Sequence, residues 1–199
     1  MSNYFIYNHG GSANHGCEAL VRTMSKLFGG SIPIYSECPQ QDIHYGVNKI
    51  GDLLPAMGPV SRLSLGFWQA YLKLKLHGDY TDMDCLPYRK AIRGMSAGGV
   101  ELSVGGDIYC YEDYHKFIRL HRQIEKRGCK SVLLGCSVSE ELFQDPEFGA
   151  DMQAYSYISA RESLTYAMLQ KAGLTNIGLT PDSAFTLETE CLPCQSPAG

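Results

Sequence analysis

Residues suited to binding a ligand gather in one loop near the N-terminus, between a predicted strand at residues 3–7 and a predicted helix at residues 17–28. The loop contains Asn14, His15 and Gly16, and it is rich in glycine. Glycines let the chain turn sharply and approach a ligand closely. The N–H groups of a helix's first turn have no backbone partner, so they can also face a ligand. The sequence therefore predicts a ligand cradle here.

The cradle fits neither of the common nucleotide-binding motifs. Gly10, Gly11 and Gly16 lack the G-x-G-x-x-G spacing of the dinucleotide fingerprint. Gly11 and Gly16 do have the spacing of a P-loop. However, Cys17 and Glu18 follow where that motif has lysine and a hydroxyl residue, and a carboxylate there would repel phosphate. Two interpretations of Glu18 stay open: a functional carboxylate, or a residue that stabilises the positive end of the helix. Cys17 is either a thiol of lowered pKa or a small packed residue.

Strand-like and helix-like segments alternate along the chain. Apolar runs predict further strands at residues 31–36, 98–104, 130–137, 155–160 and 176–179, and helical patterns occur at 87–95, 112–127 and 161–172. Residues 37–59 lack clear periodicity and predict turns with short pieces of structure. The alternation predicts an α/β fold of Rossmann-like type, with a mostly parallel sheet and helices on both faces.

Polar residues follow several of the predicted strands. In a parallel sheet, ligands bind beside the carboxyl ends of the strands. This rule groups the first loop with candidate residues from four later strand exits, which are Gly105, Gly106, Asp107, Ser137, Arg161 and Asp182.

Residues 62–77 form an unusually apolar helical segment. Leu63, Phe67, Tyr71 and Leu74 make one stripe, which further leucines and a tryptophan widen. Polar positions are few, so we expect this helix either to be well buried or to face a partner. Two such partners are considered, a membrane surface and a second copy of the chain.

The composition narrows the class of protein. The chain has 199 residues, 44% of them hydrophobic and 19% charged, which indicates a globular, soluble protein. A net charge of −4 argues against a nucleic-acid partner. Because no secretory signal and no membrane-spanning run is found, we expect a cytoplasmic protein. We also expect one domain at residues 1–187, followed by a poorly ordered tail at 188–199.

The cysteines predict neither disulfides nor a metal site. Intracellular chains of this size rarely carry a disulfide framework. Cys129 and Cys136 are interpreted as core residues. Cys191 and Cys194 form a single CxxC without a second pair, which is weak evidence for zinc.

Several ordered motifs resemble those of the polysaccharide pyruvyl transferases. The first loop, from Gly10 to Ala19, is similar to the family's opening G-G-x-x-N-x-G-x-E-A. The later motifs are Gly105-Gly106-Asp107, Leu134-Gly135-Cys136-Ser137-Val138, Ala160-Arg161-Glu162-Ser163 and Pro181-Asp182-Ser183-Ala184-Phe185. One departure is that Val138 and Ser139 follow Ser137 where many members have Gly-Pro.

The resemblance implies a function. Members of this family transfer a pyruvyl group from phosphoenolpyruvate to a sugar, as a ketal, in the synthesis of cell-surface polysaccharide. It also implies the two-domain B-type glycosyltransferase fold, of which this chain resembles only the N-terminal, acceptor-side half. The chain alone is therefore expected to lack donor-binding residues. The implied acceptor is a sugar or a lipid-linked oligosaccharide, with phosphoenolpyruvate as donor substrate, no other cofactor and no metal.

The implied chemistry assigns roles to the candidate residues. Glu18 and Asp107 are the predicted catalytic carboxylates, because either could orient or deprotonate an acceptor hydroxyl. The predicted substrate-binding residues are Asn14, His15, Gly16, Gly105, Gly106, Ser137, Arg161 and Asp182.

Some of these roles stay open. Asn14 either binds the sugar or fixes the loop. Arg161 either pairs with Glu162 at a helix start or meets the donor's negative charge. Asp182 is a cleft carboxylate or a turn residue, and Tyr109 and Tyr111 either stack on a sugar or pack in the core. Two other functions also stay open: a nucleotide- or cofactor-binding domain of another enzyme, and a non-catalytic interaction domain.

Overall fold

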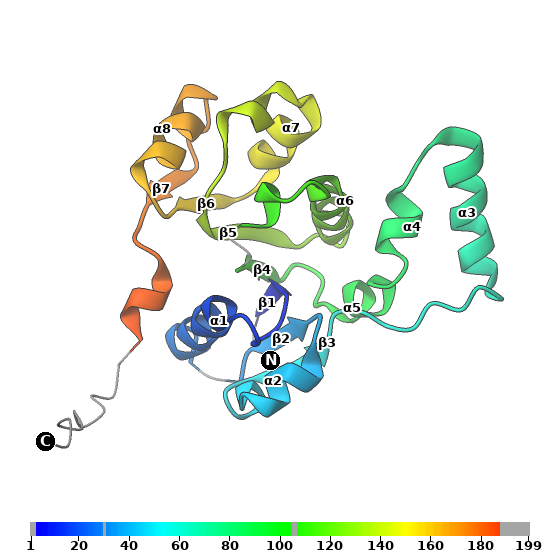
Figure 1. Cartoon of the computed structure of the whole chain (residues 1–199), viewed down its shortest axis with the longest axis horizontal. Helices are drawn as coiled ribbons and strands as arrows, with labels where there is room; N and C mark the ends of the chain where they lie inside the picture. The colour runs from blue at the N-terminus through cyan, green and yellow to red at the C-terminus, as the bar shows by residue number, and fades with distance from the viewer. Residues whose placement is uncertain (1–2, 30, 105–106, 188–199) are drawn as a thin grey trace, which may run out of the picture.

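A single parallel sheet organises the molecule (Figure 1). The computed structural model describes residues 3–29, 31–104 and 107–187. The seven strands are β1 (Tyr4–His9), β2 (Pro33–Ser36), β3 (Asp52–Pro55), β4 (Val100–Ser103), β5 (Lys130–Cys136), β6 (Tyr157–Ala160) and β7 (Ile177–Leu179). They lie in the order β3-β2-β1-β4-β5-β6-β7, and every adjacent pair is parallel. The predicted α/β, Rossmann-like fold is confirmed.

Helices connect the strands and cover both faces of the sheet. They are α1 (His15–Leu27), α2 (Pro39–His44), α3 (Leu65–His77), α4 (Thr81–Cys85), α5 (Arg89–Gly94), α6 (Tyr114–Glu125), α7 (Pro146–Ala154) and α8 (Ser163–Lys171). Successive residues of a strand point to opposite faces. Accordingly, Ile6 of β1 packs in one core cluster with Val21 of α1, whereas Tyr7 packs in another with Leu120 and Ile124 of α6.

Some elements were missed or left undefined by the sequence patterns. The region at residues 37–59 contains α2 and the edge strand β3, which is largely exposed and so lacks an apolar pattern. The short helix α4 has no local signal of its own. Helix α7 does have one, because Asp145 caps it and Pro146 occupies its first turn. The predicted tail at 188–199 and the Cys191–Cys194 pair lie outside the described residues.

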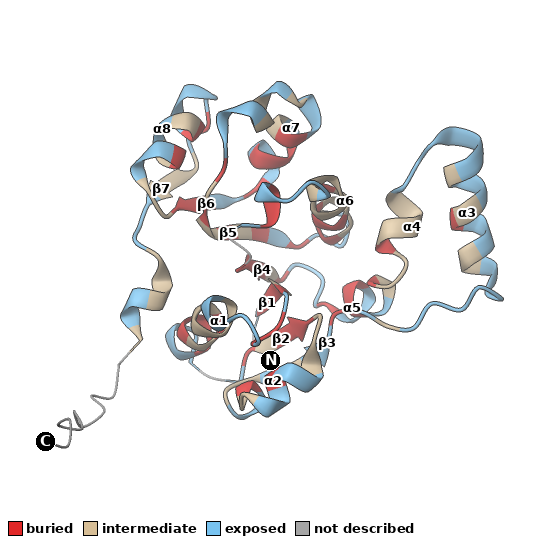
Figure 2. Ribbon diagram, viewed as in Figure 1, coloured by how far each residue is buried: buried red, intermediate tan, exposed pale blue. Residues whose placement is uncertain are grey.

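Helix α3 is not well buried, contrary to one of the two expectations for it. With α4 it stands away from the sheet, and Figure 2 colours most of it as exposed. Ala70 is its one fully buried residue. Within the described part of the chain, no helix is long and apolar enough to cross a membrane.

Candidate active site

A cavity of about 310 Å³ lies at the carboxyl ends of the strands. The chain runs outward from β1 to β2 and β3 on one side and from β4 to β7 on the other, so the topology switches between β1 and β4. The cavity is lined from both sides of this switch, by Asn8 near the end of β1 and Asn14 and Gly16 after it, and by Val104 and Asp107 after β4. This is the position at which open parallel sheets bind ligands.

A second hollow has a different setting. It measures about 720 Å³ and is lined by residues of α1 and of the segment that leads into β3, including Arg22, Lys49 and Asp52. The predicted site residues do not line it. We therefore take the smaller cavity, called the cleft below, as the candidate site.

The guanidinium of Arg161, which lines the cleft, joins three other predicted site residues, of which Asp107 and Asp182 also line it. Its Nε donates to Ser137 Oγ at 2.7 Å, and one terminal nitrogen donates to Asp107 Oδ1 at 2.5 Å. The other terminal nitrogen lies 4.0 Å from Asp182 Oδ2. Arg161 directly follows β6, Ser137 follows β5, and Asp107 comes from the segment after β4. Residues from separate strand exits are thus brought together around one cation.

The neighbouring Glu162 has a structural role. Its carboxylate accepts from the backbone N–H groups of Leu164 and Thr165 and so caps α8. The hydrogen bond from Thr165 is the main cause that lowers the pKa of Glu162. Glu162 caps the helix as one interpretation predicted, while the ion pairs of Arg161 are with Asp107 and Asp182.

Asp182 combines both of its predicted roles. Its Oδ1 accepts from the Ala184 N–H and begins η4 (Ser183–Thr186), as a turn residue would. Its other carboxylate oxygen faces Arg161, and Asp182 also lines the cleft.

Asn14 fixes the first loop and also lines the cleft. It is the N-cap of α1, and its Oδ1 accepts from Gly16 N at 2.9 Å. The loop-fixing interpretation is thus confirmed, while contact with a sugar stays a prediction. Because Gly16 and Cys17 also line the cleft, the positive end of α1 faces it.

Asn8 is a cleft residue that the sequence grouped with the first loop but did not predict as a site residue. Its backbone is left-handed, with φ of 59°, and its Nδ2 donates to Ser103 Oγ at 2.9 Å. This bond joins the ends of β1 and β4 across the switch point. The signal available was an asparagine at the end of an apolar strand, since asparagine tolerates this conformation better than most residues.

Aromatic residues and a further carboxylate complete the lining. Tyr111 is more than half exposed and lines the cleft with Phe117 and Glu37. The Glu37 carboxylate accepts from Tyr88 Oη at 2.5 Å. Tyr109, by contrast, is buried in the core, so its packing interpretation is confirmed.

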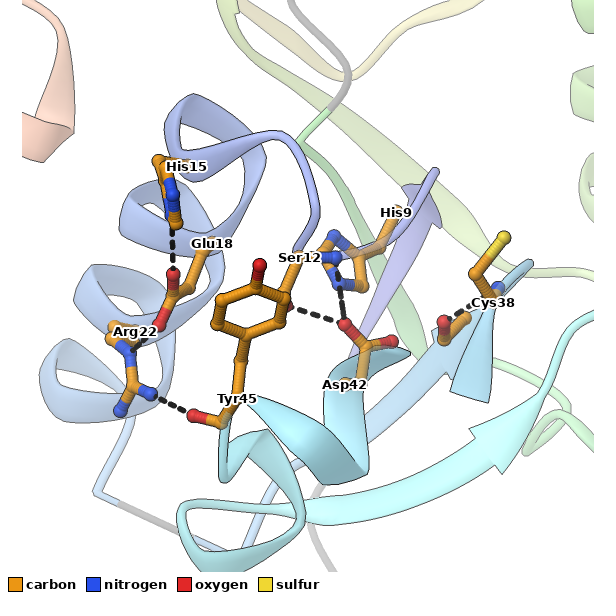
Figure 3. Close-up of polar contacts among 9 residues, drawn as sticks. His9, Ser12, His15, Glu18, Arg22, Cys38, Asp42 and Tyr45 are labelled. Atoms are coloured by element: carbon orange, nitrogen blue, oxygen red, sulfur yellow. Dashed lines mark hydrogen bonds and ion pairs between the residues drawn. The ribbon is translucent and has the colours of Figure 1, made fainter. Parts of the chain in front are cut away.

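Glu18 and His15 lie in a separate polar cluster (Figure 3). Glu18 accepts from Arg22 Nε at 2.8 Å and lies 3.1 Å from His15 Nδ1. Arg22 in turn donates to the Tyr45 carbonyl. Burial raises the pKa of Glu18, but the hydrogen bonds from Arg22 and His15 outweigh it, so the pKa lies below its usual value. Neither Glu18 nor His15 lines the cleft.

A buried carboxylate holds the first loop in place (Figure 3). Asp42 Oδ1 accepts from Ser12 N at 3.0 Å and from Ser12 Oγ at 2.5 Å, and it lies 2.8 Å from His9 Nε2. All three side chains are buried. Since Asp42 belongs to α2, this cluster attaches the loop to the next helix. Sequence patterns did not single out Asp42, because residues 37–59 carry no clear periodicity.

The Cys17 interpretation as an activated thiol is wrong. Burial, followed by the nearby carboxylates of Asp107 and Asp42, raises the pKa of the Cys17 thiol. Cys129 and Cys136 are buried, as expected of core residues. Gly105 and Gly106 lie outside the described residues. Among the residues that the structure does describe, no group of three or more His, Cys, Asp or Glu side chains could hold a metal ion.

The family profile described as polysaccharide pyruvyl transferase matches residues 70–193, more than half of the chain. The chain belongs to this family. The match contains Arg161 and the three residues that it contacts, Asp107, Ser137 and Asp182. It begins after the first loop, so the resemblance of that loop rests on its own residues. Neither the curated proteins nor the solved structures contain a match to this chain.

Proposed function

We propose that the cleft binds a sugar and that the protein transfers a pyruvyl group to it from phosphoenolpyruvate, as a ketal, in the synthesis of cell-surface polysaccharide. The observation that carries this proposal is the convergence of Asp107, Ser137 and Asp182 on Arg161, inside the segment that matches the family. As part of the proposal, the reaction takes place in the cytoplasm, where phosphoenolpyruvate is made.

The reaction requires three kinds of group. The methylene carbon of phosphoenolpyruvate gains a proton and becomes a methyl group. The central carbon forms two bonds to sugar oxygens, and its bond to the phosphate oxygen breaks. The two sugar hydroxyls release two protons: one accounts for the proton that the methylene carbon gains, and the other leaves with the phosphate. A base, an acid and groups that hold the donor's negative charges are needed.

Asp107 is our candidate base for a sugar hydroxyl. Its side chain is half exposed at the cleft, and one of its oxygens is held by Arg161. A carboxylate fixed through one oxygen can present the other to a hydroxyl at a defined position. Glu18 stays a second predicted carboxylate, although its oxygens are engaged by Arg22 and His15.

The rest of the lining suits a sugar. Tyr111 offers an exposed ring on which the apolar face of a sugar can stack, because aromatic rings combine apolar area with a polar end. Asn8, Asn14 and Glu37 supply amide and carboxylate groups that match sugar hydroxyls. The cation of Arg161 and the positive end of α1 suit the negative charges of the donor.

The test is release of phosphate from phosphoenolpyruvate in the presence of candidate sugars that carry two suitably placed hydroxyls. Replacing Asp107 by Asn should lower the rate by about 10²- to 10⁴-fold, the usual effect of removing a general base. Sugar affinity, measured by titration calorimetry, should change by less than about threefold, because asparagine keeps an oxygen for Arg161.

Asp84 provides a matched control. It also lies 2.5 Å from an arginine nitrogen, that of Arg119, but outside the cleft. Asp84→Asn should leave phosphate release unchanged. Full activity of Asp107→Asn would remove Asp107 as the base. Tight binding of NAD, S-adenosylmethionine or a nucleotide sugar in place of phosphoenolpyruvate would favour a nucleotide-binding domain.

A further inference from the structure

The outward face of α3 carries a row of large apolar side chains. Leu65, Trp68, Leu72 and Leu76 are 75%, 51%, 52% and 73% exposed. At 3.6 residues per turn, the four lie within an arc of about 80° around the helix. In the part of the chain that the structure describes, no segment covers this row, which we call the α3 stripe (Figure 2).

The fold does not need the α3 stripe. The opposite face of α3 contains Ala70, which is fully buried, and the helix packs against α4. Lys73 Nζ forms an ion pair with Asp82 Oδ2 of α4 at 2.6 Å. Ser64 caps the start of α3, and Gly78 ends it in a left-handed conformation. The helix is therefore formed and attached by its inner face and its ends, so the exposed leucines have no evident structural role, while the Trp68 ring contacts the rings of Phe67 and Tyr71 on its own helix.

The charges around the α3 stripe are positive. Between residues 53 and 78 the sequence has no Asp or Glu, but it has Arg62, Lys73 and Lys75, in a chain whose net charge is −4. Lys75 is next to Trp68 around the helix, at the edge of the stripe. The most apolar exposed segment thus carries cations and no acidic residue, and Arg62 and Lys75 are the cations that remain after Lys73 pairs with Asp82.

Acidic residues occur just beyond this segment, Asp52 before it and Asp79, Asp82 and Asp84 after it, and two of these four form ion pairs. Asp82 is bound by Lys73 and Arg89, and Asp84 by Arg119. Asp79 is exposed and accepts from Thr81 N.

We infer that α3 docks this protein on an anionic lipid bilayer. The α3 stripe enters the boundary between headgroups and acyl chains, while the flanking cations Arg62 and Lys75 bind lipid phosphates. With 13 residues, α3 is about 20 Å long, too short for the hydrocarbon core of about 30 Å, so it lies in the plane of the membrane. The inference does not depend on the proposed reaction.

The charges favour a membrane over a second copy of the chain. A symmetric dimer would place the same surface on both sides of its interface. Both sides would then carry Arg62 and Lys75 and, between residues 53 and 78, no acidic residue to pair with them, and surfaces of like charge associate less well. An anionic membrane offers an apolar layer beneath a layer of negative charge, which matches both features of α3.

Trp68 is the single tryptophan of the chain, so its fluorescence reports on α3 directly. The full chain is mixed with vesicles of phosphatidylcholine, with or without phosphatidylglycerol. We expect a blue shift of Trp68 emission, quenching by lipids brominated on their acyl chains, and cosedimentation, all with the anionic vesicles. Salt should weaken the binding, because it screens the cations.

Two leucines of equal exposure give a matched pair of variants. Leu76→Glu should weaken vesicle binding by at least about tenfold, since it places a charge in the apolar layer. Leu164, on α8, is 74% exposed, and Leu164→Glu should bind as the unaltered protein does. Circular dichroism checks that both variants fold.

Three results would overturn the inference. The first is that anionic vesicles neither cosediment with the protein nor shift the emission of Trp68. The second is that Leu76→Glu and Leu164→Glu weaken vesicle binding equally. The third is a blue shift of Trp68 emission that needs no lipid and grows with protein concentration. If the last were accompanied by dimers in analytical ultracentrifugation, a second copy would be the occupant of the α3 stripe.

Discussion

At the scale of single residues, the Arg161 guanidinium defines the geometry of the cleft. Its contacts to Asp107, Ser137 and Asp182 connect segments that are far apart in the sequence. Contacts of this kind can hold catalytic groups in position, because each side chain that binds the shared arginine loses conformational freedom. The chemistry of the proposed reaction therefore depends on how precisely Arg161 is placed.

Asp42 has the corresponding role for the first loop. It binds both the backbone and the side chain of Ser12, and it contacts His9. Burial raises the pKa of Asp42, but hydrogen bonds from Ser12, Ser36 and His9 outweigh it, so the pKa is lower than its usual value. A depressed pKa means that folding favours the charged carboxylate.

Replacing Asp42 by Asn should make the stability of the protein less dependent on acidic pH. At neutral pH we expect the free energy of unfolding to fall by about 1–3 kcal/mol, because the charged acceptor is lost. Asp42 stabilises the folded protein at pH values above the pKa that this carboxyl has in the unfolded chain, about 4. This stabilisation is lost as the pH falls through the lower pKa of the folded protein. Urea denaturation between neutral pH and strongly acidic pH measures the difference between the two proteins.

Asp52, an exposed carboxylate at the start of β3, is the control for this experiment. Asp52→Asn should change the free energy of unfolding little at any pH. A difference between the unaltered protein and Asp42→Asn that stayed constant from neutral to acidic pH would contradict the role given to Asp42.

At the scale of elements, the loop between β1 and α1 depends on one unusual glycine. Gly11 has φ of +116°, and a Cβ there would lie 2.7 Å from Gln41 Oε1 and 2.8 Å from Cys38 Cβ. The loop therefore passes close to the start of α2, which also supplies Asp42. A side chain larger than the hydrogen of glycine does not fit where the loop passes the start of α2.

Gly11→Ala should lower the free energy of unfolding by about 1–3 kcal/mol, because both the backbone conformation and the space are unsuitable. Gly10 is the matched control, since a Cβ there meets no atom within 4 Å. Gly10→Ala should leave thermal unfolding nearly unchanged. Equal melting temperatures for the two variants would show that the loop can yield at Gly11.

At the scale of the whole molecule, stability should be distributed unevenly between the sheet and α3. Strands β1 and β4 lie at the centre of the sheet and are covered on both faces. Helix α3 packs against α4 and has one fully buried residue. Segments with few buried apolar contacts open more easily than the core does.

Hydrogen exchange followed by mass spectrometry tests this distribution. Peptides from residues 65–77 should exchange at least about tenfold faster than peptides from β1 or β4, because local opening of α3 leaves the sheet intact. Exchange of α3 as slow as that of the central strands would show that the helix is part of the cooperative core.

The sequence by itself determined the alternation of strands and helices, the Rossmann-like class, and the polar residues at the strand exits. These follow from patterns within a few residues, such as the apolar run of β5 or the cap at Asn14. Only the tertiary structure decided which of those polar residues meet. Asp107 and Arg161, 54 positions apart, became partners, whereas Glu18 paired with its helix neighbour Arg22.

The same distinction applies to α3. Its composition predicted a helix that is either well buried or faces a partner, and only the packing of the described chain showed that it is not well buried. The reason in each case is that a local pattern fixes the conformation of a segment, while long-range packing decides which of its faces meets another part of the chain and which is left exposed.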